Sequence, residues 1–102
     1  MQLWEILVPS ATNAGDEIAI EHHRVWDDRV RMIAGGLTIL KTTTGIWQSP
    51  TGAIFREKMI PVRIACSEAQ IRSIIDFSMR HYDQLAIMAY LISERVLLVQ
   101  RN

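Results

Sequence analysis

The sequence contains only one cysteine, Cys66, among its 102 residues. A single cysteine excludes an intrachain disulfide and a thiolate metal cluster. Between Ala65 and Ser67 this thiol is typical of a small buried hydrophobe, although its place just before an expected helix leaves a reactive thiolate open as an alternative. Two of the three histidines, His22 and His23, are adjacent, and no pair of histidines has the spacing of metal ligands. We therefore expect no metal and no other cofactor.

An excess of charge and a long apolar run are also missing. The 11 basic residues are balanced by 11 acidic ones, whereas nucleic-acid binding favours clustered lysine and arginine. The longest apolar stretch, residues 85–92, is too short to span a bilayer, and residues 1–9 lack the pattern of a signal peptide. These absences predict a cytoplasmic protein with neither a nucleic-acid partner nor a membrane partner.

The motifs that identify common enzymes are absent as well. None of the serines lies in a nucleophile elbow, and the glycines at positions 35, 36 and 45 form no phosphate-binding loop. A side chain such as His22 or Tyr90 could still act as an acid or a base. The sequence alone leaves open whether the protein is an enzyme.

The residues that are present indicate a single α+β domain over residues 1–102. Apolar residues make up 49% of the chain and charged residues 22%, which is the balance of a globular domain with one core. The hydrophobic periodicity predicts helices at 16–34 and 67–83 and strands at 2–8, 37–41, 46–48, 53–66, 85–92 and 96–99. A bulge or bend is expected near residues 59–61, because a polar strand face becomes apolar there and Pro61 cannot donate a backbone hydrogen bond.

Local signals mark the start of both helices. Asp16 can cap the first helix through its side-chain oxygen. Ser67 and Gln70 form a capping box at the start of the second. Strand, helix, hairpin strands, a further strand, helix and strand is the order of a ferredoxin-like βαββαβ two-layer sandwich, and another two-layer α+β order of the same elements is the alternative. We therefore expect an antiparallel sheet with two helices on one face and an extra C-terminal strand.

The sheet face away from the helices is predicted to be mostly apolar. Because strand side chains alternate between the two faces, the residues on this open face are Leu3, Glu5, Leu7, Arg63, Ala65, Ala86, Met88 and Tyr90. A monomer rarely leaves such a surface in water. Two interpretations follow: a symmetric homodimer that covers the face, or a small-molecule pocket with apolar walls and a few fixed polar groups.

Three polar residues stand out on this open face, namely Glu5, Arg63 and Tyr90. Glu5 and Arg63 are expected on adjacent central strands, where they could form a cross-strand ion pair or recognise a ligand. Trp47, on a short hairpin strand, is a further candidate for the wall of a cleft because an indole is large and has a polar edge.

Three short motifs resemble those of an uncharacterised family of small bacterial α+β proteins. They match GLTV, GxW and DGxIxRE patterns and read Gly36-Leu37-Thr38-Ile39, Gly45-Ile46-Trp47 and Gly52-Ala53-Ile54-Phe55-Arg56-Glu57. The chain departs from the family at Thr51, where aspartate is usual, and in lacking a secretory start. The resemblance implies an α+β fold and a cluster of Trp47, Arg56 and Glu57 around the hairpin, but no activity. Arg56 thereby joins Glu5, Arg63, Tyr90 and Trp47 as a candidate ligand-binding residue.

Our leading hypothesis is a homodimeric, non-catalytic module that binds a small ligand or a protein partner. One alternative is a small cofactor-free enzyme of the dimeric α+β type, monooxygenase- or isomerase-like, acting through His22, Tyr90, Glu5 or Arg63. Another is an inhibitor or ligand sponge from a mobile element. A pocket that brings a histidine, glutamate or tyrosine within hydrogen-bond reach of another would favour the enzyme. A pocket shared between subunits without such a pair would favour the sponge.

Overall fold

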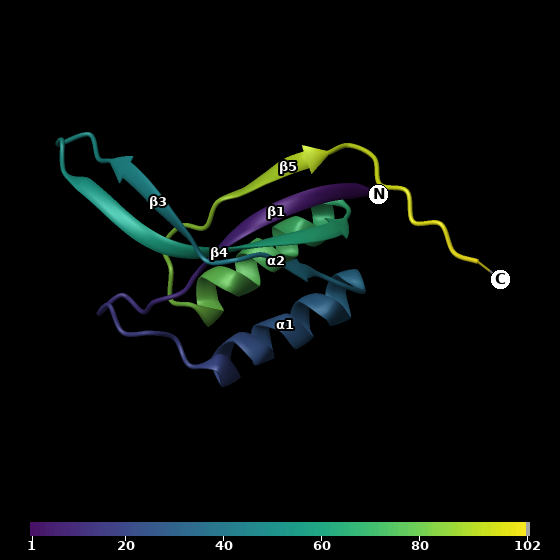
Figure 1. Ribbon diagram of the computed structural model, residues 1–102, viewed down its shortest axis with the longest axis horizontal. Coiled ribbons are helices and arrows are strands. Elements are labelled where there is room, and N and C mark those ends of the chain that lie inside the picture. The colour runs from purple at the N-terminus through teal and green to yellow at the C-terminus, as the bar shows by residue number, and fades with distance from the viewer. Residues whose placement is uncertain (102) are drawn as a thin grey trace.

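A computed structural model describes residues 1–101 and shows a five-stranded antiparallel sheet. Two helices cover one face of this sheet (Figure 1). The elements in chain order are β1 (Gln2–Pro9), α1 (Ile20–Ala34), β2 (Thr38–Ile39), β3 (Thr43–Gln48), β4 (Ile54–Cys66), α2 (Glu68–His81) and β5 (Ala89–Ser93). The strand order is β2-β4-β1-β5, and β3 also pairs with β4. The predicted ferredoxin-like α+β fold is confirmed. Neither helix has the length and hydrophobicity needed to cross a bilayer.

Strands β2 and β3 both pair with β4, each with a different part of its length. Ile39 of β2 is opposite Val62, and Thr43 of β3 is opposite Met59. The long strand β4 therefore pairs with β1 and β2 over its second half and with β3 over its first half. The first half projects with β3 beyond the helices as a hairpin, which we call the arm (residues 43–58; Figure 1).

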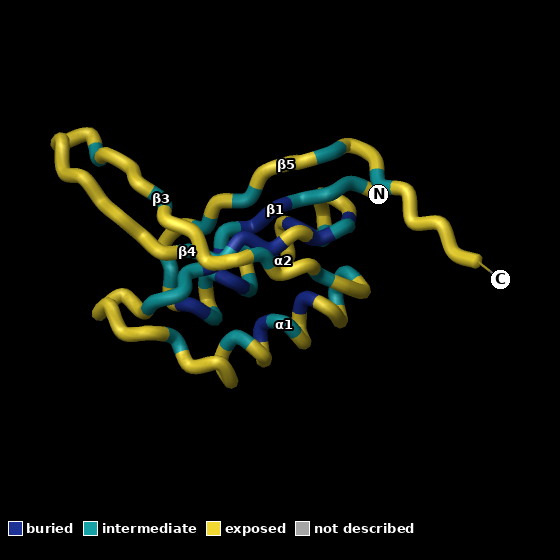
Figure 2. Tube along the Cα trace, in the orientation of Figure 1, coloured by how far each residue is buried: buried dark blue, intermediate teal, exposed yellow. Residues whose placement is uncertain are grey.

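The core lies between the sheet and the helices, as the alternation of strand residues predicts (Figure 2). Alternate side chains of β1 and β4 are almost completely buried and meet two residues from each helix: Ile6, Val8, Val62, Ile64, Cys66, Trp26, Val30, Ile71 and Ile74. Cys66 is thus the buried hydrophobe that the sequence predicts. Desolvation raises the pKa of its thiol, which disfavours the reactive thiolate form.

The start of α2 is confirmed and the start of α1 is not. Ser67 accepts a hydrogen bond from the Gln70 backbone N–H at 3.2 Å, and the Gln70 side chain accepts one from the Ser67 backbone N–H at 2.9 Å. Helix α1 begins at Ile20 rather than Asp16. The Asp16 backbone N–H instead donates to the Thr12 hydroxyl, so this aspartate belongs to a turn that precedes the helix.

The strand β4 is also continuous, with no bulge near Pro61, but it bends as it passes from the arm to the part that pairs with β1 (Figure 1). The sequence pattern changes there for a different reason. Residues before Met59 lie on the arm, where no helix covers the sheet, while Ile60 and the alternate residues after it face the helices. The same strand face is therefore polar over one half and apolar over the other with no change of register.

The C-terminal part of the chain differs most from the prediction. The strand expected over residues 85–92 is formed only at Ala89–Ser93, where β5 pairs with β1 from Leu3 to Ile6. Residues 96–99 form no strand. A turn at Ser93 and Arg95 carries the chain away from β5, so these residues find no neighbouring strand within their own copy.

A buried hydrogen bond joins the two helices and provides a test of this packing. The Trp26 indole N–H donates to the Ser78 hydroxyl at 2.8 Å, and Ser78 is fully buried. Ser78→Ala should cost about 1–3 kcal/mol of unfolding free energy, because it leaves a buried donor without an acceptor. Urea denaturation would measure the loss. The matched control Ser73→Ala, at an exposed site on the same helix, should stay within about 0.5 kcal/mol of the parent, and an equal loss in both variants would contradict this packing.

Candidate functional site

Glu5 lies at the centre of the open sheet face, between one partner on each neighbouring strand. It is opposite Arg63 of β4 and opposite Tyr90 of β5. One carboxylate oxygen accepts a hydrogen bond from the Arg63 Nε–H at 3.0 Å, and the other accepts one from the Tyr90 hydroxyl. With 7% of its surface exposed, Glu5 is the one charged residue that is buried within residues 1–101.

The two partners keep the Glu5 side chain ionised. The hydrogen bond from Tyr90, together with the bond and charge of Arg63, lowers the pKa of Glu5 although partial burial acts in the opposite direction. The same contact raises the pKa of Tyr90, since its proton is shared with a carboxylate. At neutral pH the site therefore holds a carboxylate, a guanidinium and a protonated phenol.

This network lies in the floor of an open cleft of about 850 Å³. The cleft is bounded by β1, β4, β5 and the β2–β3 segment and is lined by Glu5, Leu7, Ile39, Leu40, Lys41, Thr43, Thr44, Gly45, Met59, Pro61, Arg63 and Tyr90. Its volume is in the range of small-molecule sites, which combine apolar walls with a few polar groups.

Two positively charged side chains, Arg63 and Lys41, line the cleft. Arg63 uses Nε to hold Glu5, and its side chain remains 44% exposed. Within residues 1–101 the two terminal nitrogens of Arg63 make no hydrogen bond, and Lys41 forms no ion pair. Since Glu5 already has two partners, the free hydrogen-bonding capacity of the cleft is mainly that of donors. This arrangement suits an anionic group such as a carboxylate or a phosphate.

Trp47 and Arg56 do not join this cleft. Both lie on the arm, where Trp47 stacks on Phe55 with ring centroids 4.5 Å apart, and Arg56 is opposite Ile46 in the register. Trp47 and Arg56 are neighbours in the hairpin on opposite faces, because side chains at successive positions alternate. Glu57, the third residue of the expected cluster, lies opposite Gly45.

The cleft also contains residues that sequence reasoning missed, notably Lys41, Thr43 and Thr44. Lys41 is the last residue of a predicted strand, and Thr43 and Thr44 lie between two predicted strands. The alternation of side chains carries no information about which central strand this segment will join. Their placement depends on β2 and β3 pairing with the same strand, β4.

A second group of titratable residues lies on the other side of the molecule, between the ends of the two helices. The rings of His22 and His81 stack with centroids 3.8 Å apart, and each Nε2 bonds the backbone carbonyl of the other residue. His23 forms a hydrogen bond with the Tyr82 hydroxyl through its Nδ1 at 2.7 Å. Desolvation lowers the pKa of His23. His22 is therefore occupied in holding the helices and does not reach the cleft.

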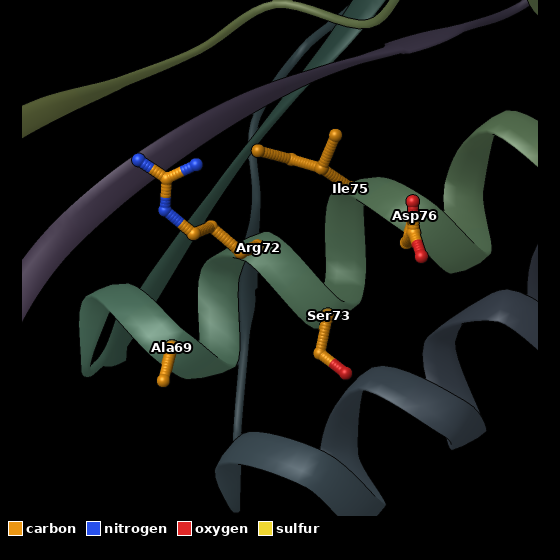
Figure 3. Close-up of a pocket in the computed structure, with 5 residues that line it drawn as sticks. All are labelled: Ala69, Arg72, Ser73, Ile75 and Asp76. Carbon is orange, nitrogen blue, oxygen red and sulfur yellow. The ribbon is translucent and has the colours of Figure 1, made fainter.

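Within the described residues, no group of three or more histidine, cysteine, aspartate or glutamate side chains is arranged to hold a metal ion. A second depression, of about 430 Å³, lies along α2 and is lined by Ala69, Arg72, Ser73, Ile75 and Asp76 (Figure 3). All five side chains leave one helix, in different directions. Because it contains no buried charged group and draws on no second element, this depression is a weaker candidate than the cleft over Glu5.

The network predicts that Arg63 contributes to stability. Arg63→Ala removes a charged hydrogen bond from a buried carboxylate and should cost about 1–3 kcal/mol in urea denaturation. The double variant Glu5→Gln, Arg63→Met should recover much of this loss, because no buried charge remains without its partner.

Arg72→Ala is the matched control for this substitution. Arg72 pairs with Glu68 on the exposed side of α2 at 3.3 Å, and such surface pairs contribute about 0–1 kcal/mol. An Arg63→Ala loss no larger than that of Arg72→Ala would show that the Glu5–Arg63 pair is solvated and would remove the basis for this site.

Comparison with protein-family models and with curated proteins gave no match. Comparison with solved structures gave matches over nearly the whole chain. The divalent cation tolerance protein CutA1 from Thermus thermophilus is 11% identical with a TM-score of 0.65, over 99% of this chain and 86% of that one. CutA1 from Oryza sativa is 8% identical with a TM-score of 0.68, over 95% and 82%.

A phage SAM lyase in complex with S-methyl-5'-thioadenosine is a further structural neighbour. It is 12% identical with a TM-score of 0.66, over 89% of this chain and 79% of that one. At sequence identities this low, the structural similarity shows a shared fold but not a shared function. The chain thus has the ferredoxin-like fold of the CutA1 proteins.

Proposed function

We propose that this protein is a non-catalytic binding module whose ligand occupies the cleft over Glu5. The observation that carries the proposal is the Arg63–Glu5–Tyr90 network, a buried ionised group held by two partners in the floor of a cleft. Holding a carboxylate out of water is costly unless it is paired, and the network presents the free nitrogens of Arg63 in a fixed position.

The chemistry of the cleft favours a small molecule with an anionic group and an apolar body. Arg63 and Lys41 would hold a carboxylate or a phosphate, while Leu7, Met59 and Pro61 provide apolar surface beside them. A planar guanidinium suits these anions because it can donate two parallel hydrogen bonds.

A second candidate function is an enzyme that acts on S-adenosylmethionine. Two observations favour it: a glutamate and a tyrosine are in hydrogen-bond contact in the cleft, and one protein of the same fold is a phage SAM lyase. The Glu5–Tyr90 pair also argues against a sponge from a mobile element, which we would expect to lack such a pair. The pKa of Glu5 is lowered and the pKa of Tyr90 is raised, so both move away from neutral pH. Because a proton-transfer group works best with a pKa near the operating pH, these directions favour binding over proton transfer.

We further propose that the protein works as a homodimer in the cytoplasm. Apolar side chains beside the network and along β5 support self-association, because Met88, Leu91 and Ile92 are substantially exposed in the single copy. A second copy is the partner that these surfaces fit most simply.

Thermal unfolding with a panel of metabolites, including S-adenosylmethionine and S-methyl-5'-thioadenosine, tests the function. A ligand present at ten times its dissociation constant adds about 1.4 kcal/mol of stability, which raises the Tm by roughly 6–11 °C for a domain of this size. We expect carboxylates or phosphates to produce such shifts, and Arg63→Met to abolish them. The matched control Arg72→Met should keep them. Shifts that survive in Arg63→Met, or no shift with any compound, would contradict the proposal.

The same incubations separate binding from catalysis. Chromatography of samples that contain S-adenosylmethionine should show no S-methyl-5'-thioadenosine above the background without protein if the module only binds. Release of this product, reduced at least tenfold by Glu5→Gln, would instead establish the enzyme.

A further inference from the structure

The last part of the chain leaves the sheet as an extended segment that we call the tail (residues 94–101). The Val96 backbone N–H donates to the Met1 carbonyl at 3.1 Å, and this is the last hydrogen bond that the described tail makes with the body. Leu97, Leu98 and Val99 are then 72%, 73% and 88% exposed. Figure 1 shows the tail running away from the sheet, and Figure 2 shows most of it exposed.

The tail has the composition of a β-strand but no neighbour to pair with. Val96-Leu97-Leu98-Val99 contains no glycine or proline and is flanked by Arg95 and Gln100. Because successive strand side chains point to opposite faces, a strand here would be apolar on both faces. Such a pattern is typical of a strand that is covered on both sides. It is the pattern from which the sequence predicts a strand at 96–99.

The molecule also has a sheet edge that lacks a neighbour. Within residues 1–101, β5 pairs with β1 on one side and with no strand on the other. Apolar surface lies on both faces of this edge: Leu91, opposite Trp4, lies on the helix face, and Tyr90, opposite Glu5, lies on the open face. Both are 38% exposed. The opposite edge of the sheet, formed by β2 and β3, is less suitable because half of the β3 residues are Thr43, Thr44 and Gln48.

The tail cannot reach this edge in its own copy. The Ser93 hydroxyl accepts a hydrogen bond from the Arg95 backbone N–H at 3.2 Å and donates to the Arg95 carbonyl at 2.9 Å, which fixes a turn directly after β5. The next hydrogen bond, from Val96 to Met1, places the tail beyond the start of β1. The tail therefore points away from the β5 edge of its own copy.

We propose that the tail of one copy adds as a strand to the outer edge of β5 in a second copy. The four residues 96–99 fit within the five-residue edge Ala89–Ser93, and backbone hydrogen bonds would continue the ladder while both tail faces become buried. Two copies that exchange tails make two equivalent contacts and close a dimer. The added strand would lie beside Tyr90, so assembly would also complete the β5 side of the cleft.

The shape of the single chain agrees with this exchange. Its radius of gyration is 14.6 Å, above the roughly 13 Å of a compact domain of about 100 residues. The molecule extends 53 Å along its longest axis, with the tail at one end and the arm at the other (Figure 1). An exposed apolar segment and an unpaired edge are each an aggregation hazard in a monomer, and pairing one with the other removes both.

A proline substitution in the full-length chain tests the proposal. Leu98→Pro removes one backbone N–H and prevents regular pairing, yet leaves the residue apolar. Light scattering coupled to size exclusion should show the parent as a multiple of 11.7 kDa and Leu98→Pro as a single chain, with unchanged far-UV circular dichroism. The matched control Gln100→Pro lies beyond the apolar run and should assemble like the parent.

A labelled peptide of residues 94–102 tests the acceptor edge directly. Fluorescence anisotropy should show the peptide binding to the Leu98→Pro chain, whose β5 edge is unoccupied. The same peptide with Leu98→Pro should bind at least tenfold more weakly, and adding Ile92→Lys to the chain should have a similar effect by placing a charge at the edge. An unchanged mass for Leu98→Pro, a parent of single-chain mass, or equal binding of both peptides would overturn the proposal.

Discussion

The ionised carboxylate of Glu5 is the feature on which the rest of this structure depends. A charge in the middle of an apolar sheet face is tolerated only if it is paired, and Glu5 has its two partners on two different strands. Both pairs require β1 to lie between β4 and β5, with Glu5 opposite Arg63 on one side and Tyr90 on the other. A shift of either strand by one residue would turn these partners toward the core. The network therefore specifies the register as well as the site.

The helices cover only one face of the sheet, and this leaves the cleft, the arm and the tail uncovered. Both helices pack on the same side, where they bury the core, and the other side keeps the cleft and its charged floor. The arm extends beyond the helices and exposes Trp47 and Phe55, and the tail leaves at the far end (Figure 1). The parts of the molecule that are free to contact ligands or other copies are thus those that the helix layer does not reach.

The sequence was sufficient for features that depend on local periodicity. Alternation along three strands placed Glu5, Arg63 and Tyr90 on one face, and the Ser67–Gln70 spacing located the start of α2. Features that depend on a distant neighbour were missed. The hydroxyl of Thr12 draws Asp16 into a turn, and the stack of His22 on His81 exists only because the two helices run antiparallel with these ends together. The tail was predicted as a strand, but a strand also needs an edge to pair with, and no sequence pattern identifies one.

The pKa of the Glu5 carboxyl group tests the central claim most directly. Carbon-13 NMR can follow the side-chain carboxyl of Glu5 from neutral to strongly acidic pH. The account predicts a pKa below the ordinary value of 4.5, because Tyr90 and Arg63 favour the ionised form, and it predicts that Tyr90→Phe moves this pKa upward. A pKa at or above 4.5 in the parent, or no change in Tyr90→Phe, would contradict the account, since Glu5 would then be either a solvated residue or a neutral buried acid.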